Sequence, residues 1–191
     1  MIVFDTTALS FLFIPGYVPS KPVKHGKERL EELVEAMTAN QDKIGIPSPA
    51  LSEFLVTCNE KQTNEFLKMV RTSAWLEILD FDTPSAVEVA IRTRKAIEAG
   101  DKREGLTVGN AKMKFDRQIV GIAIAHGATQ IISDDKDVKS LGDRWGMKVL
   151  RVEELPIPAA LIPPPLIAAA IEADEKAAAV AKPSVAKPSK E

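Results

Sequence analysis

Residues 2–7 of this 191-residue chain read IVFDTT, and this stretch decides the fold. Its three apolar residues favour a β-strand and are too few for a helix. Asp5 follows the strand directly, with the hydroxyls of Thr6 and Thr7 after it. Ligands of open α/β sheets bind outside the carboxyl ends of the strands, so Asp5 is a candidate functional residue. Aspartate is also an ordinary turn or helix N-cap residue, and Asp5 alone does not decide between these roles.

Short apolar strands and amphipathic helices alternate along the rest of the chain. Further strands are expected at 44–47, 76–79, 130–133 and 148–152. Helices are expected at 8–14, 27–39, 48–56, 62–71, 85–99, 115–126 and 137–145. This alternation predicts an α/β fold with three α/β/α layers and a central, mostly parallel sheet of about five strands.

A change in composition near Glu154 predicts the end of the folded domain. We expect a folded α/β domain at 1–154 and a C-terminal extension at 155–191, which is rich in proline, alanine and lysine. An alanine-rich segment at about 166–181 is expected to be helical. The final residues repeat the sequence AKPS, and we expect them to be disordered.

The composition excludes several classes of protein. Apolar residues make up 45% of the chain and charged residues 27%, as in ordinary globular proteins. A net charge of −2 excludes a generally basic nucleic-acid binder, so contact with nucleic acid needs a local basic patch or metal ions. A single cysteine, Cys58, excludes an intramolecular disulfide and a multi-cysteine zinc site, and it suits a reducing compartment. We expect a soluble, cytoplasmic protein, because Asp5 interrupts the first apolar run and prolines break the run after Leu155.

Acidic residues occupy comparable points of the predicted alternation, at the exit of a strand or the entry of a helix. They are Asp5, Glu53, Asp116 and the group Asp134, Asp135 and Asp137. Each has a structural explanation as a turn former or a partner of a helix dipole. If the strands are parallel, however, these carboxylates meet at one edge of the sheet and repel one another unless cations compensate. Oxygen ligands select Mg²⁺ or Mn²⁺, and two such ions suit the attack of water on a phosphodiester.

Four segments of the chain resemble the signature segments of PIN domains. They are 2–9, 47–55, 116–125 and 131–141, and the resemblance spans about residues 2–152 in the right order and spacing. The toxins of type II, VapBC-like toxin–antitoxin pairs match the chain best in size. The chain departs from the family at Val138, where phenylalanine is usual, and in residues 100–114, which form a longer link before the third acid.

The resemblance implies a metal-dependent endoribonuclease with an RNA substrate and, for a toxin, a small antitoxin protein as inhibitor. It also implies catalytic, metal-binding acids at Asp5, Glu53, Asp116 and Asp135, with Asp137 as an additional metal ligand. Thr6 and Ser133 match supporting hydroxyl positions, and Ser133 stands where the family usually has a threonine that orients the first acid. The cofactor is expected to be Mg²⁺ or Mn²⁺, and we expect a homodimer.

Basic residues are densest just before and after the expected start of the 115–126 helix. Lys112, Lys114 and Arg117 are candidate RNA contacts, although such a helix face is often simply solvated.

Two other functions stay open at this point. A haloacid-dehalogenase-like phosphatase also has an aspartate after its first strand, but it needs a second acid where this chain has Thr7. The other is a non-catalytic PIN-like interaction module. A metal titration separates it from a nuclease, because a protein without a metal site is not stabilised by Mn²⁺.

Overall fold

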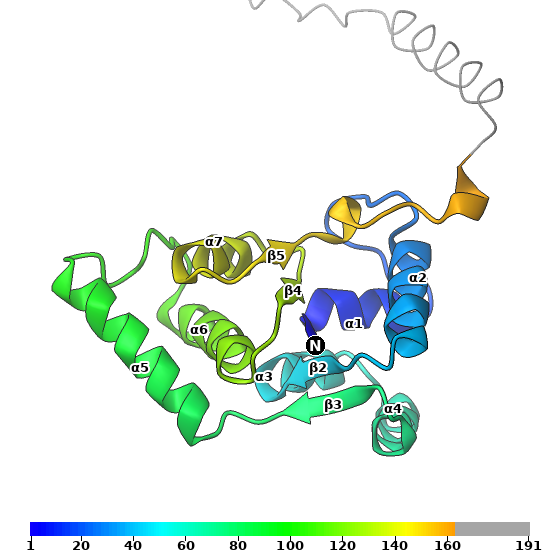
Figure 1. Cartoon of the computed structure of the whole chain (residues 1–191), viewed down its shortest axis with the longest axis horizontal. Coiled ribbons are helices and arrows are strands. Elements are labelled where there is room, and N and C mark those ends of the chain that lie inside the picture. The colour runs from blue at the N-terminus through cyan, green and yellow to red at the C-terminus, as the bar shows by residue number, and fades with distance from the viewer. Residues whose placement is uncertain (163–191) are drawn as a thin grey trace, which may run out of the picture. The chain divides into compact units, whose positions relative to one another are not determined.

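The computed structural model of the protein describes residues 1–162, and Met1–Pro156 forms one compact unit (Figure 1). Its strands are β1 Ile2–Phe4, β2 Ile44–Pro47, β3 Leu76–Leu79, β4 Gln130–Ile132 and β5 Val149–Leu150. Its helices are α1 Thr6–Phe13, α2 Gly26–Ala39, α3 Ser48–Val56, α4 Glu60–Thr72, α5 Thr83–Glu98, α6 Asn110–Ala125 and α7 Lys136–Trp145, with a 3-10 turn at Val152–Glu154. Beyond Pro156, a second 3-10 turn spans Ala159–Leu161. The helix expected at about 166–181 and the repetitive tail lie outside the described residues.

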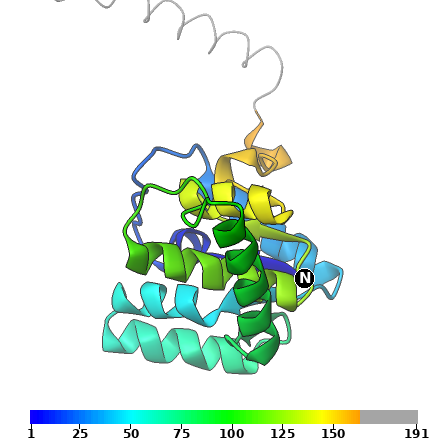
Figure 2. The same cartoon turned by 90° about the vertical axis from the view of Figure 1, so that its left-hand side faces the viewer.

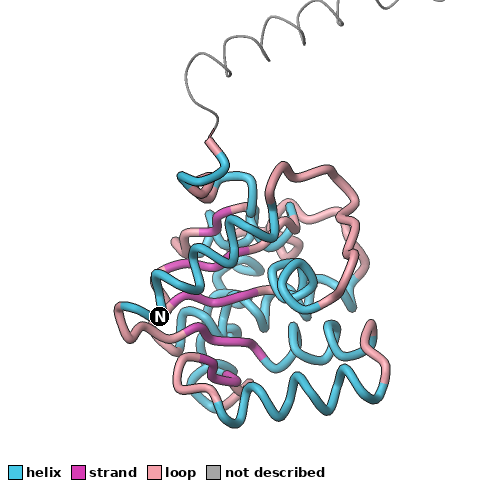
Figure 3. The backbone as a smooth tube through the Cα atoms, turned by 90° about the vertical axis from the view of Figure 1, so that its right-hand side faces the viewer, coloured by secondary structure: helices cyan, strands magenta, loops and turns pink. Residues whose placement is uncertain are grey.

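The five strands form one sheet in the order β3-β2-β1-β4-β5, and every pairing is parallel (Figure 3). The predicted α/β class is therefore confirmed. β1 lies at the centre, where Phe4 pairs with Ile132 at the carboxyl ends of β1 and β4. This register brings the residues that follow these two strands, Asp5 and Ser133, next to each other.

Alternate residues of the strands pack against helices on opposite faces of the sheet. Ile2 and Phe4 belong to a core that includes Leu9 of α1 and Leu30 of α2. Val3 belongs to a second core, which includes Ile122 of α6, Leu141 of α7 and the buried Val138. In Figure 1, α1, α2 and α4 accordingly lie on one side of the strands and α5, α6 and α7 on the other. Figure 2 views the latter side, where α5 crosses α6.

The start of α6 differs from the prediction by about one and a half turns. The helix begins at Asn110 rather than at residue 115, so the link before it covers only residues 100–109. Residues 110–114 read NAKMK and contain good helix formers, and Met113 buries its side chain in the first turns. Asp116 therefore lies two turns into the helix rather than at its start, with Lys112 one turn before it.

In the part of the chain that the structure describes, no helix is long and apolar enough to cross a bilayer.

Candidate acidic site at the carboxyl edge of the sheet

Asp5 and Ser133 are joined at the carboxyl edge of the sheet. The Asp5 N–H donates to the Ile132 carbonyl at 3.1 Å, which extends the β1–β4 pairing by one residue. The Ser133 hydroxyl donates to Asp5 Oδ2 at 2.6 Å and accepts from the Asp135 N–H at 3.1 Å. One fully buried hydroxyl thus orients the first acid and the start of the loop that carries the next two.

The Asp5 carboxyl is buried, and its exposed fraction is only 4%. Burial raises the pKa of Asp5 to about 6, against the lowering effect of the hydrogen bond from Ser133. The negative charges of Asp135 and Glu53 raise this pKa further. A buried acid surrounded by like charge is stabilised as a carboxylate by a nearby cation.

Glu53 reaches the cluster from α3, on a different part of the chain. Ser48 and Pro49 begin this helix directly after β2, which points its first turns toward the same edge of the sheet. Thr6, the first residue of α1, donates from Oγ1 to Glu53 Oε2 at 2.8 Å. Thr6 therefore holds the exposed Glu53 carboxylate close to Asp5.

The remaining acids meet around one ammonium group. Lys112 Nζ lies 3.1 Å from Asp116 Oδ2, 2.9 Å from Asp135 Oδ2 and 3.2 Å from Asp137 Oδ2. Asp135 is the N-cap of α7, where its Oδ1 accepts from the Asp137 N–H at 2.7 Å. The structure thus groups Asp116, Asp135 and Asp137 around Lys112, and it places Asp5 within electrostatic range of Asp135 and Glu53.

Burial and charge oppose each other within this second group. Burial raises the pKa of Asp116 to about 6, although the charge of Lys112 lowers it. Partial burial by itself lowers the pKa of Lys112, but the hydrogen bond with Asp135 and the charges of Asp116 and Asp135 outweigh it and raise the pKa above its ordinary value. Lys112 is therefore charged at neutral pH.

Asp134 has a structural role instead. Its Oδ1 accepts from the Val152 N–H at 2.9 Å, and its own N–H donates to Thr7 Oγ1 at 3.1 Å. These bonds tie the end of β4 to α1 and to the turn after β5. The Thr7 hydroxyl thus accepts a backbone hydrogen bond. Thr7 occupies the position where a haloacid-dehalogenase-like site needs a second acid.

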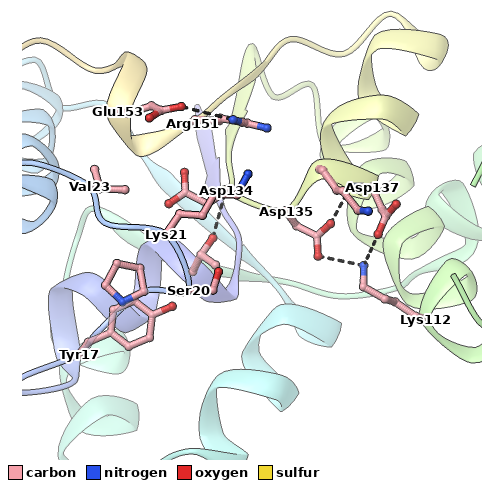
Figure 4. Close-up of a pocket in the computed structure, with 13 residues that line it drawn as sticks. Tyr17, Ser20, Lys21, Val23, Lys112, Asp134, Asp135, Asp137, Arg151 and Glu153 are labelled. Atoms are coloured by element: carbon pink, nitrogen blue, oxygen red, sulfur yellow. Dashed lines mark hydrogen bonds and ion pairs between the residues drawn. The ribbon is translucent and has the colours of Figure 1, made fainter. Parts of the chain in front are cut away.

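A cavity of about 400 Å³ opens beside the acids (Figure 4). On one side lie Lys112, Asp135 and Asp137, and on another lie Tyr17 and Ser20 from the loop after α1. Lys21 and Arg151 add positive charge to the wall. Burial and then the charges of Asp134 and Asp5 raise the pKa of Tyr17, so its hydroxyl is within electrostatic range of the acids.

Only one of the three predicted RNA contacts lies at this cavity, namely Lys112. Lys114 is exposed and is absent from the cavity lining. The prediction for Arg117 is wrong, because its side chain is buried and pairs with Glu104 Oε2 at 2.8 Å. Glu104 also accepts from Trp145 Nε1 at 2.6 Å, so Arg117 fastens the 100–109 loop to the core.

Sequence reasoning did not single out Tyr17, Lys21 or Arg151, although all three line the cavity. Tyr17 is the only tyrosine of the chain and lies in a loop that directly follows the helix carrying Thr6. That proximity to a candidate acid in sequence is the signal that would have identified the loop as a wall of the site.

The donor set of the cluster fits a divalent cation that prefers oxygen, since every candidate ligand is a carboxylate. A cation bound nearby would stabilise the ionised form of Asp5, because burial opposes ionisation of this carboxyl. Within residues 1–162, however, no group of three or more histidine, cysteine, aspartate or glutamate side chains is already arranged to hold a metal ion. Lys112 lies instead among three of the acids.

Comparison with known proteins bears on the fold. No protein-family model matches the sequence, and no curated protein matches it either. A chain of VapBC2 from Rickettsia felis, solved bound to a DNA fragment from the promoter, is 18% identical with a TM-score of 0.52. The match covers 79% of this chain and 98% of that chain. A chain of DNA-bound VapBC from Salmonella typhimurium is 19% identical with a TM-score of 0.47, covering 79% and 97% of the two chains.

The fold and the site together define a parallel α/β protein with an acidic cluster at the carboxyl edge of its sheet. The chain shares its fold with the VapBC2 chain, in agreement with the PIN-domain fold that the resemblance implies.

Proposed function

We propose that this protein is a divalent-metal-dependent endoribonuclease of the toxin type, which hydrolyses phosphodiester bonds of RNA. The observation that supports this proposal best is the grouping of Asp116, Asp135 and Asp137 around Lys112 at a cavity, next to a buried Asp5 on which the charges of Asp135 and Glu53 act. Carboxylates in such a cluster destabilise the fold unless a cation joins them.

Asp5, Glu53 and Asp135 are the residues that would hold Mg²⁺ or Mn²⁺. A bound divalent ion supplies the Lewis acidity that lowers the pKa of an attacking water and neutralises charge on the phosphate. The chain contributes the positions of the ligands, since Ser133 orients Asp5 and Asp135, and Thr6 orients Glu53. Hydrogen-bonded partners of this kind keep ligand carboxylates in place.

The cavity wall opposite the acids suits a single-stranded nucleotide. The half-buried ring of Tyr17 offers a face on which a base stacks, and base stacking on aromatic rings is tolerant of sequence. Lys21 offers positive charge for a flanking phosphate, and Arg151 is a second cation that pairs with Glu153 Oε1 at 3.3 Å. A net charge of −2 for the whole chain makes these local cations necessary for RNA binding.

Further proposals concern partners and location. The similar chain from Rickettsia felis belongs to VapBC2, and we propose that this chain also pairs with a small antitoxin and forms a homodimer. The lone thiol of Cys58 suits a reducing compartment, and we propose the cytoplasm. Analytical ultracentrifugation of the purified chain, alone and with the product of any small reading frame found next to its gene, tests both assemblies.

The decisive experiment incubates the purified full chain with structured RNAs in the presence of Mn²⁺ or EDTA. Cleavage is expected with Mn²⁺ and not with EDTA, and Asp5→Asn is expected to abolish it. Asp143→Asn makes the same chemical change at an exposed position of α7 and is expected to cleave like the parent. If Asp5→Asn and the parent cleave equally fast, the assignment is wrong.

One observation favours a second function, that of a non-catalytic interaction module. Lys112 already neutralises part of the acidic cluster, so the fold tolerates these acids better than bare carboxylates would allow. A module without a metal site gains no thermal stability from Mn²⁺, whereas the proposed nuclease does. A Mn²⁺ titration followed by melting temperature separates the two functions.

A further inference from the structure

Lys112 is the cationic centre of the acidic cluster. Its Nζ is within 3.2 Å of a carboxyl oxygen on each of three residues, namely Asp116 of α6 and the pair Asp135 and Asp137 at the start of α7. The Lys112 side chain is 40% exposed, while those of Asp116 and Asp137 are at most 9% exposed. Lys112 thus reaches from the cavity into the buried part of the cluster.

The stability of α6 does not explain a lysine at this position. Lys112 lies in the first turn of α6, where the helix dipole disfavours positive charge. A lysine placed four residues before an acid is also the weaker orientation of a helical ion pair. The favourable interactions of Lys112 are therefore those with the acids, two of which lie on another helix.

Within residues 1–162, one part of the cluster pairs with a cation and the other part forms no ion pair. Asp116 and Asp137 pair with Lys112, and Asp135 links the two parts because it pairs with Lys112 and its charge also acts on Asp5. Asp5 accepts from the Ser133 hydroxyl, and Glu53 accepts from the Thr6 hydroxyl. Because the charges of Asp135 and Glu53 both act on Asp5, the second part is where a divalent ion lowers the most repulsion.

We propose that the Lys112 ammonium takes the place of a second divalent ion, so that the site binds a single ion, on the side of Asp5, Glu53 and Asp135. This inference rests on the metal site of the proposed function and specifies its composition. Two-metal sites place two cations on the phosphate being cleaved, and a fixed ammonium beside one ion supplies the same number of positive centres. Lys112 also lines the cavity, where its charge faces a bound phosphate.

The test is the stoichiometry of Mn²⁺ binding to the full chain, measured by isothermal titration calorimetry and by the loss of the free Mn²⁺ signal in electron paramagnetic resonance. We expect one ion for the wild type and two for Lys112→Met, because the variant frees three carboxylates. Lys114→Met removes the same charge from an exposed position two residues away and is expected to bind one ion. Lys112→Arg keeps the charge and is also expected to bind one.

A second readout uses melting temperature without any substrate. In EDTA, Lys112→Met is expected to melt below the wild type because its three acids lose their counter-ion, and Mn²⁺ is expected to reverse the order. If Lys112→Met does not fold, the wild-type stoichiometry alone decides, since two ions on the wild type overturn the inference. Equal stoichiometry for the wild type and a folded Lys112→Met overturns it as well.

The outcomes separate this inference from the proposed function. If neither protein binds Mn²⁺, the metal site itself is absent and both proposals fail. If the wild type binds two ions and cleaves RNA, only the role of Lys112 is wrong. If the wild type binds one ion and Lys112→Met binds two but no RNA is cleaved, the role of Lys112 stands and the proposed reaction fails.

Discussion

The Ser133 hydroxyl donates a 2.6 Å hydrogen bond to the carboxyl of Asp5, a residue 128 positions earlier in the chain. The bond exists because β1 and β4 are parallel neighbours that end in register. The same hydroxyl accepts from the Asp135 N–H, so the orientations of two acids depend on one side chain.

Removing this hydroxyl is expected to destabilise the protein in a pH-dependent way. In EDTA at about pH 8, Ser133→Ala leaves the buried Asp5 carboxylate without its donor, at a cost of about 1–3 kcal/mol in the free energy of unfolding. Near pH 4.5 the cost is expected to be smaller, because Asp5 is then protonated. Ser133→Thr keeps the hydroxyl and serves as the control. Urea unfolding at the two pH values measures this, and a loss independent of pH contradicts it.

Asp5 itself is expected to lower the stability of the metal-free protein above about pH 6. Its folded-state pKa of about 6 exceeds the ordinary aspartate pKa of 3.8, so between these values the folded state binds more protons than the unfolded state. Stability contributed by Asp5 therefore falls as pH rises through this window and stays low above it.

Asp5→Asn removes that cost, so in EDTA at pH 7.5 the variant is expected to be more stable than the parent, by at most about 3 kcal/mol. The gain should shrink toward pH 4 and reverse when Mn²⁺ is added, since only the parent keeps the full ligand set. Asp143→Asn, at an exposed position, should show none of these changes. A variant that is less stable than the parent at every pH contradicts the burial argument.

The sheet and the positions of most acids follow from the sequence because they depend on local patterns. Buried parallel strands such as residues 44–47 are short apolar runs, and acids at their exits converge whenever the strands are parallel. These features require no knowledge of which helix packs against which. They are the part of the fold that hydrophobic periodicity determines.

The ion pairs did not follow from the sequence, because they depend on contacts between distant elements. Lys112 has the pattern of a surface residue, and its meeting with Asp135 depends on how α6 packs against α7. The sequence around Arg117 also has the pattern of a surface residue, yet Arg117 is buried and pairs with Glu104 from the preceding loop. Charged residues with the same sequence pattern thus lie either at the site or in the core, and the packing of the helices decides which.

Thr6 is expected to matter for metal binding more than for stability. Its Oγ1 donates to Glu53 Oε2 at 2.8 Å, and Thr6→Val removes this donor at nearly constant volume. The exposed Glu53 side chain then samples other rotamers, and we expect a loss of about 10–100-fold in Mn²⁺ affinity and RNA cleavage. Thr6→Ser keeps the donor and should bind Mn²⁺ like the parent. Equal Mn²⁺ affinity for Thr6→Val and the parent, measured by calorimetry, contradicts this role.

Glu104 is expected to matter for stability. It is buried, pairs with Arg117 and accepts from Trp145 Nε1, so Glu104→Ala leaves a buried guanidinium without its partner. We expect a loss of about 3–5 kcal/mol in the free energy of unfolding. Glu98→Ala, at an exposed position near the end of α5, is the control and should change it by less than about 1 kcal/mol. Urea unfolding compares the two, and similar losses would show that the Glu104 pair is not the anchor of the loop.

The cavity beside the acids predicts a specific pattern of RNA binding. Tyr17→Leu removes the ring on which a base stacks, and Tyr17→Phe removes only the hydroxyl. A stacked base contributes about 1–3 kcal/mol, so Tyr17→Leu is expected to weaken binding of a short single-stranded RNA about tenfold, whereas Tyr17→Phe keeps the affinity.

Lys21→Ala removes an exposed cation and should also reduce the dependence of affinity on salt by about one phosphate contact. Fluorescence anisotropy with Ca²⁺ in place of Mn²⁺ at several salt concentrations measures all three variants without cleavage. Equal affinities for Tyr17→Leu and Tyr17→Phe contradict stacking, and an unchanged salt dependence for Lys21→Ala contradicts its contact with phosphate, because each variant removes one of the two interactions and leaves the other in place.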